Sequence, residues 1–161
     1  MKGKLGKTVL AGGLCLLVAV PAALGEDMTR EEYVARVEPI CKSNTDSYSD
    51  TLKGVKDQIK NGKLAAAGRR FAIAARAYGK AVNRIAAVPQ PPADAEKLGR
   101  WLGYLRLEKT YLDKITKALK AGQRFQSELY VVKLTRNVTR ANNVVVSFGF
   151  HYCRVNPSKF T

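Results

Sequence analysis

The chain of 161 residues has the length of a single domain. Hydrophobic residues make up 46% of it, which is enough for a core and excludes a wholly disordered chain. Its 28 lysine and arginine residues outnumber 13 acidic ones, giving a net charge of +15, and one histidine and three cysteines leave little from which to build a metal site.

Residues 1–25 have the three-part pattern of a secretory signal peptide. It consists of three lysines, an apolar run and two small residues before the cleavage point: Lys2, Lys4 and Lys7, then Val9 to Val20, then Ala23 and Gly25. An uncleaved membrane anchor is the alternative, but the run is shorter than the roughly 20 residues of a spanning helix. Lipidation at Cys15 is disfavoured because no leucine stands three places before it. We therefore expect cleavage before Glu26 and one domain over residues 26–161, without a further membrane span.

Cleavage leaves Cys41 and Cys153 as a pair. In an oxidising compartment such a pair is expected to form a disulfide. Two free thiols are the alternative, and a redox-active pair is disfavoured because such pairs have the closely spaced CxxC arrangement.

Apolar residues recur at three- and four-residue steps in four segments, which predicts four helices. Their expected ranges are 29–60, 63–88, 93–121 and 123–148. Thr29 and Glu32 form a capping box at the start of the first helix. Pro39 interrupts that helix, so residues 29–38 form either a separate turn or a kinked first segment.

The last predicted helix has the most regular apolar stripe of the chain. Its members are Leu134, Val138, Ala141, Val145, Phe148 and Tyr152. Phe125, Leu129 and Val132 follow a slightly different phase, so the first two turns of this helix are expected to pack elsewhere.

The connections between the four segments are short, as in the linker Pro89–Pro92, and short connections favour antiparallel neighbours. The predicted fold is therefore all-α, an up-down-up-down antiparallel four-helix bundle. In that topology the first helix starts at the end of the bundle where the fourth helix stops. If the first helix begins near Pro39, Cys41 and Cys153 meet there, and the disulfide lies at a bundle pole.

Four short motifs carry a resemblance to a group of known proteins. They are Tyr33 to Ile40-Cys41, the Pro-x-Pro-Pro turn from Pro89 to Pro92, Ala121-Gly122, and Gly149-Phe150 to Cys153. With these the chain resembles small secreted helical-bundle proteins of high-GC Gram-positive bacteria. The resemblance implies the bundle, secretion and the Cys41–Cys153 bridge, and it implies no activity. The chain departs from lipid-anchored members of the group by lacking a lipobox.

The residue types needed for catalysis or a cofactor are scarce, so we expect no enzyme, no metal site and no cofactor. His151 is the single histidine, and the residue three places before it is Phe148 rather than the glutamate of a di-metal bundle. Haem held between Met28 and His151 is the one cofactor arrangement to consider. It is disfavoured because both residues lie outside the expected helix ends.

Basic residues gather on two helix faces. No acid occurs between Asp57 and Asp94, and nine basic residues face one acid from position 114 to the end. The candidate anion-binding face consists of Arg69, Arg76, Lys80 and Arg84 on the second predicted helix and Lys133, Arg136 and Arg140 on the fourth. A solvated surface is the structural alternative. Nucleic acid is a disfavoured partner because secretion and the lack of a recognised binding motif argue against it.

Two functions follow from these features. The first is a non-catalytic secreted protein of the cell envelope that associates with anionic wall polymer, anionic lipid surfaces or an acidic protein. The second is a bundle that binds a small ligand. Polar side chains that face the core would favour the second, and Asn44, Asn142 and Asn143 are the candidates.

Overall fold

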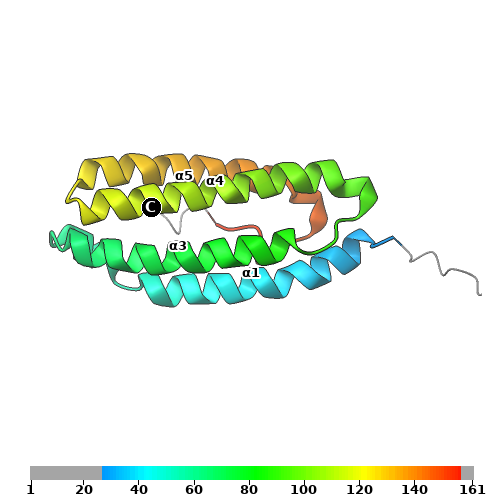
Figure 1. Cartoon of the computed structure of the whole chain (residues 1–161), viewed down its shortest axis with the longest axis horizontal. Helices are drawn as coiled ribbons and strands as arrows, with labels where there is room; N and C mark the ends of the chain where they lie inside the picture. Colours follow the sequence, from blue (N-terminus) through cyan, green and yellow to red (C-terminus); the bar gives the residue numbers. More distant parts are fainter. Residues whose placement is uncertain (1–26, 157–161) are drawn as a thin grey trace, which may run out of the picture.

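The computed structural model describes residues 27–156, and this part of the chain is helical (Figure 1). Four long helices lie side by side: α1 (Arg30–Leu52), α3 (Leu64–Ala86), α4 (Ala95–Lys120) and α5 (Arg124–Val144). A short helix, α2 (Val55–Lys60), and two 3₁₀ turns, η1 (Pro92–Asp94) and η2 (Val146–Phe148), complete the described part, which contains no strand. The all-α prediction is confirmed. The predicted signal peptide at 1–25 lies outside the described residues.

The start of α1 is the capping box that the sequence predicts. The Thr29 hydroxyl accepts a hydrogen bond from the Glu32 backbone N–H at 3.2 Å, and the Glu32 carboxylate accepts one from the Thr29 N–H at 2.9 Å. Each bond satisfies a donor that has no partner within the helix.

Pro39 does not divide α1, so of the two alternatives for residues 29–38 the separate turn is wrong: they are the first part of α1. A proline inside a helix costs about 3 kcal/mol. The buried face of α1, however, continues through this position, with Tyr33 and Val37 before it and Ile40 after it. Burying each such side chain contributes roughly 1.5–3 kcal/mol, so a continuous helix is the better solution.

The first predicted helix is instead broken at Gly54, which separates α1 from α2. Gly54 has φ of 75°, a left-handed conformation that residues with a Cβ adopt at a cost. After this turn Val55, the first residue of α2, is buried, and Arg70 of α3 donates a hydrogen bond to the Lys53 carbonyl.

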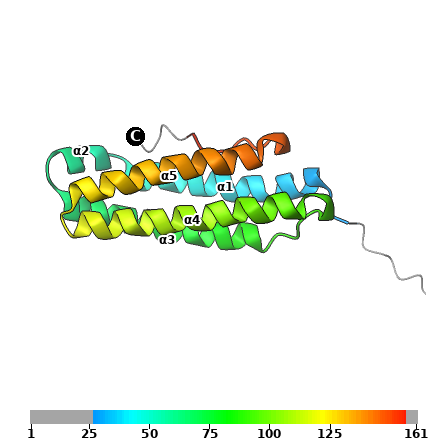
Figure 2. The same ribbon diagram turned by 90° about the horizontal axis from the view of Figure 1, so that it is seen from above.

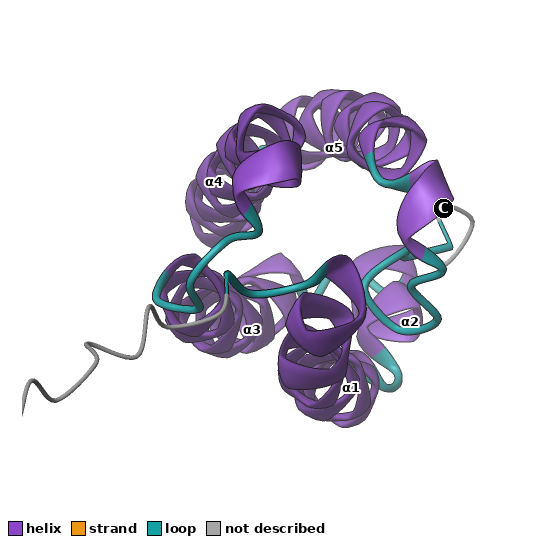
Figure 3. Ribbon diagram, turned by 90° about the vertical axis from the view of Figure 1, so that its right-hand side faces the viewer, coloured by secondary structure: helices purple, strands orange, loops and turns teal. Residues whose placement is uncertain are grey.

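The helices pack in chain order, but the arrangement is not closed. α3 packs against α1 on one side and α4 on the other, and α4 packs against α5. The backbones of α1 and α5 barely approach each other, and in the view along the bundle the chain after α5 lies between them (Figure 3). We call this opening between α1 and α5 the seam.

The seam is covered by the residues that follow η2, and we call residues 149–156 the C-terminal strap. The strap begins at Gly149, where φ is 70°, and it turns back along the bundle instead of extending α5 (Figure 2). Phe150 anchors it in the core. The Phe150 ring stacks on Trp101 of α4, with 5.3 Å between the ring centres, and on Phe148, with 5.6 Å between the ring centres.

Glu38 of α1 fastens the strap from the other side. Its carboxylate accepts hydrogen bonds from three successive backbone N–H groups, those of His151, Tyr152 and Cys153, at 3.0–3.1 Å. Next to it Cys41 and Cys153 form the predicted disulfide, which is thereby confirmed. Its placement at a bundle pole is wrong. Cys41 lies at the middle of α1, because α1 continues through Pro39 and the strap brings Cys153 back along the bundle.

Arg30 joins three elements at the end of the bundle where α1 begins. Its guanidinium donates two hydrogen bonds to the Asp94 carboxylate, at 2.6 and 2.7 Å, and lies 4.8 Å from the centre of the Phe148 ring. Asp94 is buried, so this charge needs its partner. The pair holds α1, η1 and η2 together.

We expect the double substitution Cys41→Ala and Cys153→Ala to lower the free energy of unfolding by about 2–5 kcal/mol, because the bridge closes a loop of 112 residues. Urea denaturation of residues 26–161 measures this. Under oxidising conditions the unsubstituted protein should show no titratable thiol after denaturation. Two titratable thiols, or equal stability of the two proteins, would contradict the role given to the bridge.

Candidate functional site

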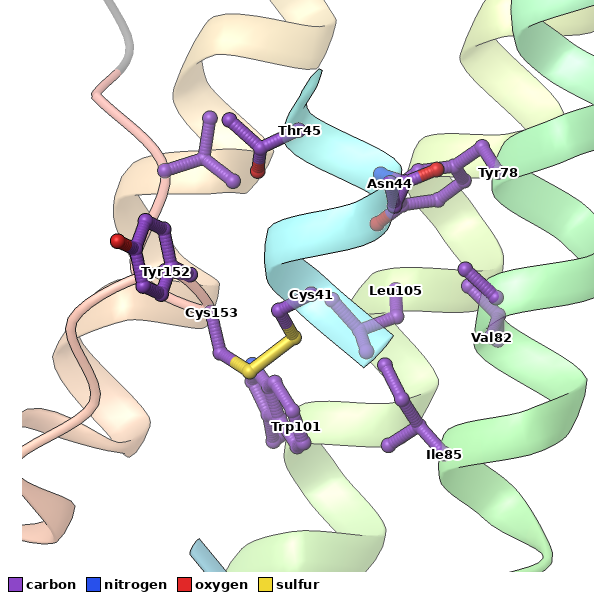
Figure 4. Close-up of a pocket in the computed structure, with 12 residues that line it drawn as sticks. Cys41, Asn44, Thr45, Tyr78, Val82, Ile85, Trp101, Leu105, Tyr152 and Cys153 are labelled. Carbon is purple, nitrogen blue, oxygen red and sulfur yellow. A yellow bond between two sulfur atoms is a disulfide. The ribbon is translucent and has the colours of Figure 1, made fainter. Parts of the chain in front are cut away.

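The seam contains a series of apolar compartments along α1. The inner compartment is bounded by the disulfide and by Trp101, Ile85 and Tyr152 (Figure 4). The middle compartment is lined by Tyr48, Tyr78, Glu108, Leu112 and Leu134, together with other residues of α1 and the strap. Their volumes are small, about 30 and 40 Å³, which leaves room for water-sized molecules only.

The outer compartment lies where α1 gives way to α2. Its walls are aliphatic and aromatic, and the main lining residues are Leu52, Val55, Ile59, Phe71, Ile115 and Val131. Its volume is about 360 Å³, so it is much the largest of the three, and it is partly open to solvent. Neighbouring compartments share lining residues: Tyr48, Ser49 and Leu134 border the outer and middle ones, and Asn44, Thr45, Tyr78 and Val155 border the middle and inner ones. The three therefore form one elongated groove.

Glu108 lies at the floor of the middle compartment. Its side chain comes from the inner face of α4, and the residue is only 4% exposed. The Tyr78 hydroxyl of α3 donates to Oε2 at 2.5 Å, and the Asn137 amide of α5 lies 3.4 Å from Oε1 while also donating to the Tyr104 carbonyl at 3.0 Å. No cation pairs with Glu108 among the described residues.

Burial dominates the protonation of this cluster. It raises the pKa of Glu108 to about 7, although the hydrogen bonds from Tyr78 and Asn137 act in the opposite direction. Burial and the nearby Glu108 raise the pKa of the Tyr78 hydroxyl well above its usual value, and the pKa of Tyr48 rises for the same two reasons. The groove thus has a carboxyl group at its floor that changes charge near neutral pH.

Glu108 is not among the site residues predicted from the sequence, although its position in the apolar pattern contains a signal. Glu108 stands three residues after Leu105 and four before Leu112, within the apolar stripe of α4. Asn137 likewise falls between Leu134 and Ala141 in the stripe of α5. A polar residue on a buried stripe has to find polar partners across the core, and here two such residues meet each other.

The candidate core-facing asparagines have three different positions. Asn44 lines the middle and inner compartments. Asn142 donates to the Val155 carbonyl at 2.7 Å and so holds the strap, whereas Asn143 is exposed. Of the two residues considered for haem, Met28 packs against the core near the start of α1, and His151 is exposed on the strap.

The seven basic residues of the candidate anion-binding face are all exposed. Arg69, Arg76, Lys80 and Arg84 lie on α3, and Lys133, Arg136 and Arg140 lie on α5. None of them takes part in an ion pair with the residues that the structure describes. Since α3 and α5 lie on opposite sides of α4, the charges form two separate faces, the α3 basic face and the α5 basic face.

Apolar side chains accompany both basic faces. Ile73 is 49% exposed, four residues after Arg69 and three before Arg76. The sequence pattern predicts that the first two turns of α5 pack elsewhere, and this prediction is wrong. Phe125, Leu129 and Val132 are instead exposed, because the α5 stripe that packs on α4 begins at Ser127 and Leu134.

Comparison of the chain with models of protein families, with curated proteins and with solved structures gives no match. The resemblance to secreted helical bundles of high-GC Gram-positive bacteria therefore stays a prediction. Within residues 27–156, no helix is long and apolar enough to cross a membrane, and no three acidic, histidine or cysteine side chains gather where a metal ion would bind.

We expect Glu108→Gln to change how stability depends on pH. The pKa of Glu108 rises from 4.5 to about 7 on folding. The contribution of its protonation to the free energy of unfolding is therefore full below about pH 4.5 and is lost as the pH rises through 7. The glutamine variant should therefore gain on the order of 3 kcal/mol relative to the unsubstituted protein between pH 4.5 and 8. Denaturation curves across this range measure the difference, and Glu96→Gln, on the exposed side of α4, is the control. A constant difference would show that Glu108 titrates normally.

Proposed function

We propose that the protein is a secreted, non-catalytic component of the cell envelope, built as an up-down-up-down bundle, that associates with anionic surfaces through its basic faces. The observation that carries the proposal is the exposure of seven cations that have no ion-pair partner among the described residues. Unpaired exposed cations create a field that attracts polyanions. The four-residue linker Pro89–Pro92 supports alternating helix directions.

The disulfide supports the proposed location outside the cytoplasm, because such bonds persist in oxidising compartments. Support for a non-catalytic role comes from the surroundings of Glu108. Its hydrogen-bond partners are a tyrosine and an amide, and the single histidine is exposed on the strap. General acid–base chemistry requires groups that converge on a substrate, and His151 is not among the residues that line the groove with Glu108.

Among anionic surfaces, lipid headgroups fit the basic faces better than a purely polar wall polymer. Ile73 lies within the α3 basic face, and Val132 lies one turn before Arg136 on α5. Helices that bind a membrane interface combine cations with large apolar side chains in this way. A wall polymer would use the charges and leave the apolar side chains in water.

We expect replacement of Arg69, Arg76, Lys80 and Arg84 by glutamine to weaken binding to vesicles that contain anionic lipid, while the fold stays intact. Sedimentation with the vesicles at low and at physiological salt measures this, since salt screens exposed charges beyond about 8–10 Å.

The matched control is the quadruple glutamine variant at Arg36, Lys97, Arg100 and Arg106. These residues are exposed on α1 and α4, and their substitution removes the same number of positive charges. A parallel assay on purified cell wall separates the two surfaces. Binding that is absent at physiological salt, or equal for the two quadruple variants, would reduce the charge of the α3 basic face to an aid to solubility.

Ligand binding is the second candidate function, and the groove in the seam specifically favours it. A well-packed bundle fills the space between its helices, whereas here α1 and α5 stay apart over a partly open apolar groove. Asn44 and Glu108 supply polar groups at its wall and floor, which is the usual make-up of a small-molecule site.

A further inference from the structure

We propose that the groove in the seam binds a single-chain amphiphile with an anionic head group, the head at Lys53 and Lys56 and the chain in the outer compartment. The proposal rests on the second candidate function, ligand binding in the groove, and names the chemical class of the ligand.

The room in the groove favours an apolar chain in the outer compartment. That compartment provides about 360 Å³, whereas the middle and inner ones provide about 40 and 30 Å³. Its walls come from α1, α2, α3, α4 and α5, and apolar side chains predominate in it. A compact polar ligand would leave most of this apolar surface exposed to water, whereas a hydrocarbon chain would bury it.

The charges at the groove favour an anionic head group. Lys53 and Lys56 line the outer compartment, and both are exposed. Neither forms an ion pair with a residue in the described part of the chain, and no acidic side chain lines that compartment. Glu108 is the one acid along the groove, and it lies further in, already hydrogen-bonded by Tyr78.

The groove narrows beyond the outer compartment. Tyr48 and Leu134 border both the outer and the middle compartment, and the middle and inner compartments have volumes of only about 40 and 30 Å³. Figure 4 shows Cys41, Cys153 and Trp101 together at the far end. A chain that enters beside Lys53 therefore ends near Tyr48.

The test is calorimetric titration of oxidised residues 26–161 with three probes of equal chain length: myristate, tetradecanol and tetradecyltrimethylammonium. We expect myristate to bind with a stoichiometry of one and more tightly than the other two. The double variant Lys53→Gln and Lys56→Gln should bind myristate about three- to tenfold more weakly, as expected for the loss of two exposed charge contacts. Its matched control is Lys60→Gln with Lys63→Gln, exposed residues close by that do not line the groove.

A second pair of variants tests the position of the chain. Ser49 is exposed and borders the outer and middle compartments, so Ser49→Trp should fill the groove and abolish binding without altering the core. Ser47→Trp, also exposed on α1 but not a lining residue, should bind normally. The quadruple variant of the α3 basic face should bind myristate as the unsubstituted protein does.

The possible failures are distinguishable. Equal binding of the three probes, or equal loss in the two lysine double variants, would overturn the anionic head group and leave ligand binding in place. No binding of any probe, or equal binding to the Ser49→Trp and Ser47→Trp variants, would overturn the ligand site itself. Loss of binding in the variant of the α3 basic face would place the amphiphile on the outer surface and overturn the groove as its site.

Discussion

The attachment of the C-terminal strap to α1 is the constraint on which this fold depends. Among the long helices α1 packs mainly along α3, so a bundle held by the packing of these helices alone would be open on one side. The Cys41–Cys153 bond and the three N–H groups that donate to Glu38 bring the end of the chain to the middle of α1. Phe150 then fills the core against Trp101. The strap thus takes the place of a direct contact between α1 and α5.

That arrangement has a consequence for the interior. Side chains from α1 and α5 would interdigitate in a closed bundle, at the packing density of a protein core. With the strap as a spacer, the middle of the seam keeps unfilled space beside Tyr48 and Leu134. Burying Glu108 there works against stability, since a charged carboxyl loses its hydration. Local features that oppose folding tend to occur at functional sites, and this one lies at the floor of the groove.

The two proposed sites use different parts of the molecule and different physics. The basic faces are on the outside of α3 and α5, where salt screens the charges and single substitutions leave the fold unchanged. The groove is inside, where apolar burial and one protonation equilibrium decide what binds. An amphiphile with an anionic head group would be available at the same kind of surface that the basic faces attract, so the two functions are compatible within one protein.

The sequence by itself determined the local features: the start of α1 at Thr29, the ends of α3 and α4, and the pairing of Cys41 with Cys153. Each depends on neighbouring residues, as in a capping box, or on simple counting of cysteines. Tertiary structure decided the features that depend on contacts between residues far apart in the chain. Pro39 stays within α1 because Val37 and Ile40 on either side of it are buried, and Glu108 is buried because Tyr78 and Asn137 approach it from other helices. The strap turns back because Phe150 finds Trp101 nearly fifty residues away in the chain, and no pattern within either segment contains that information.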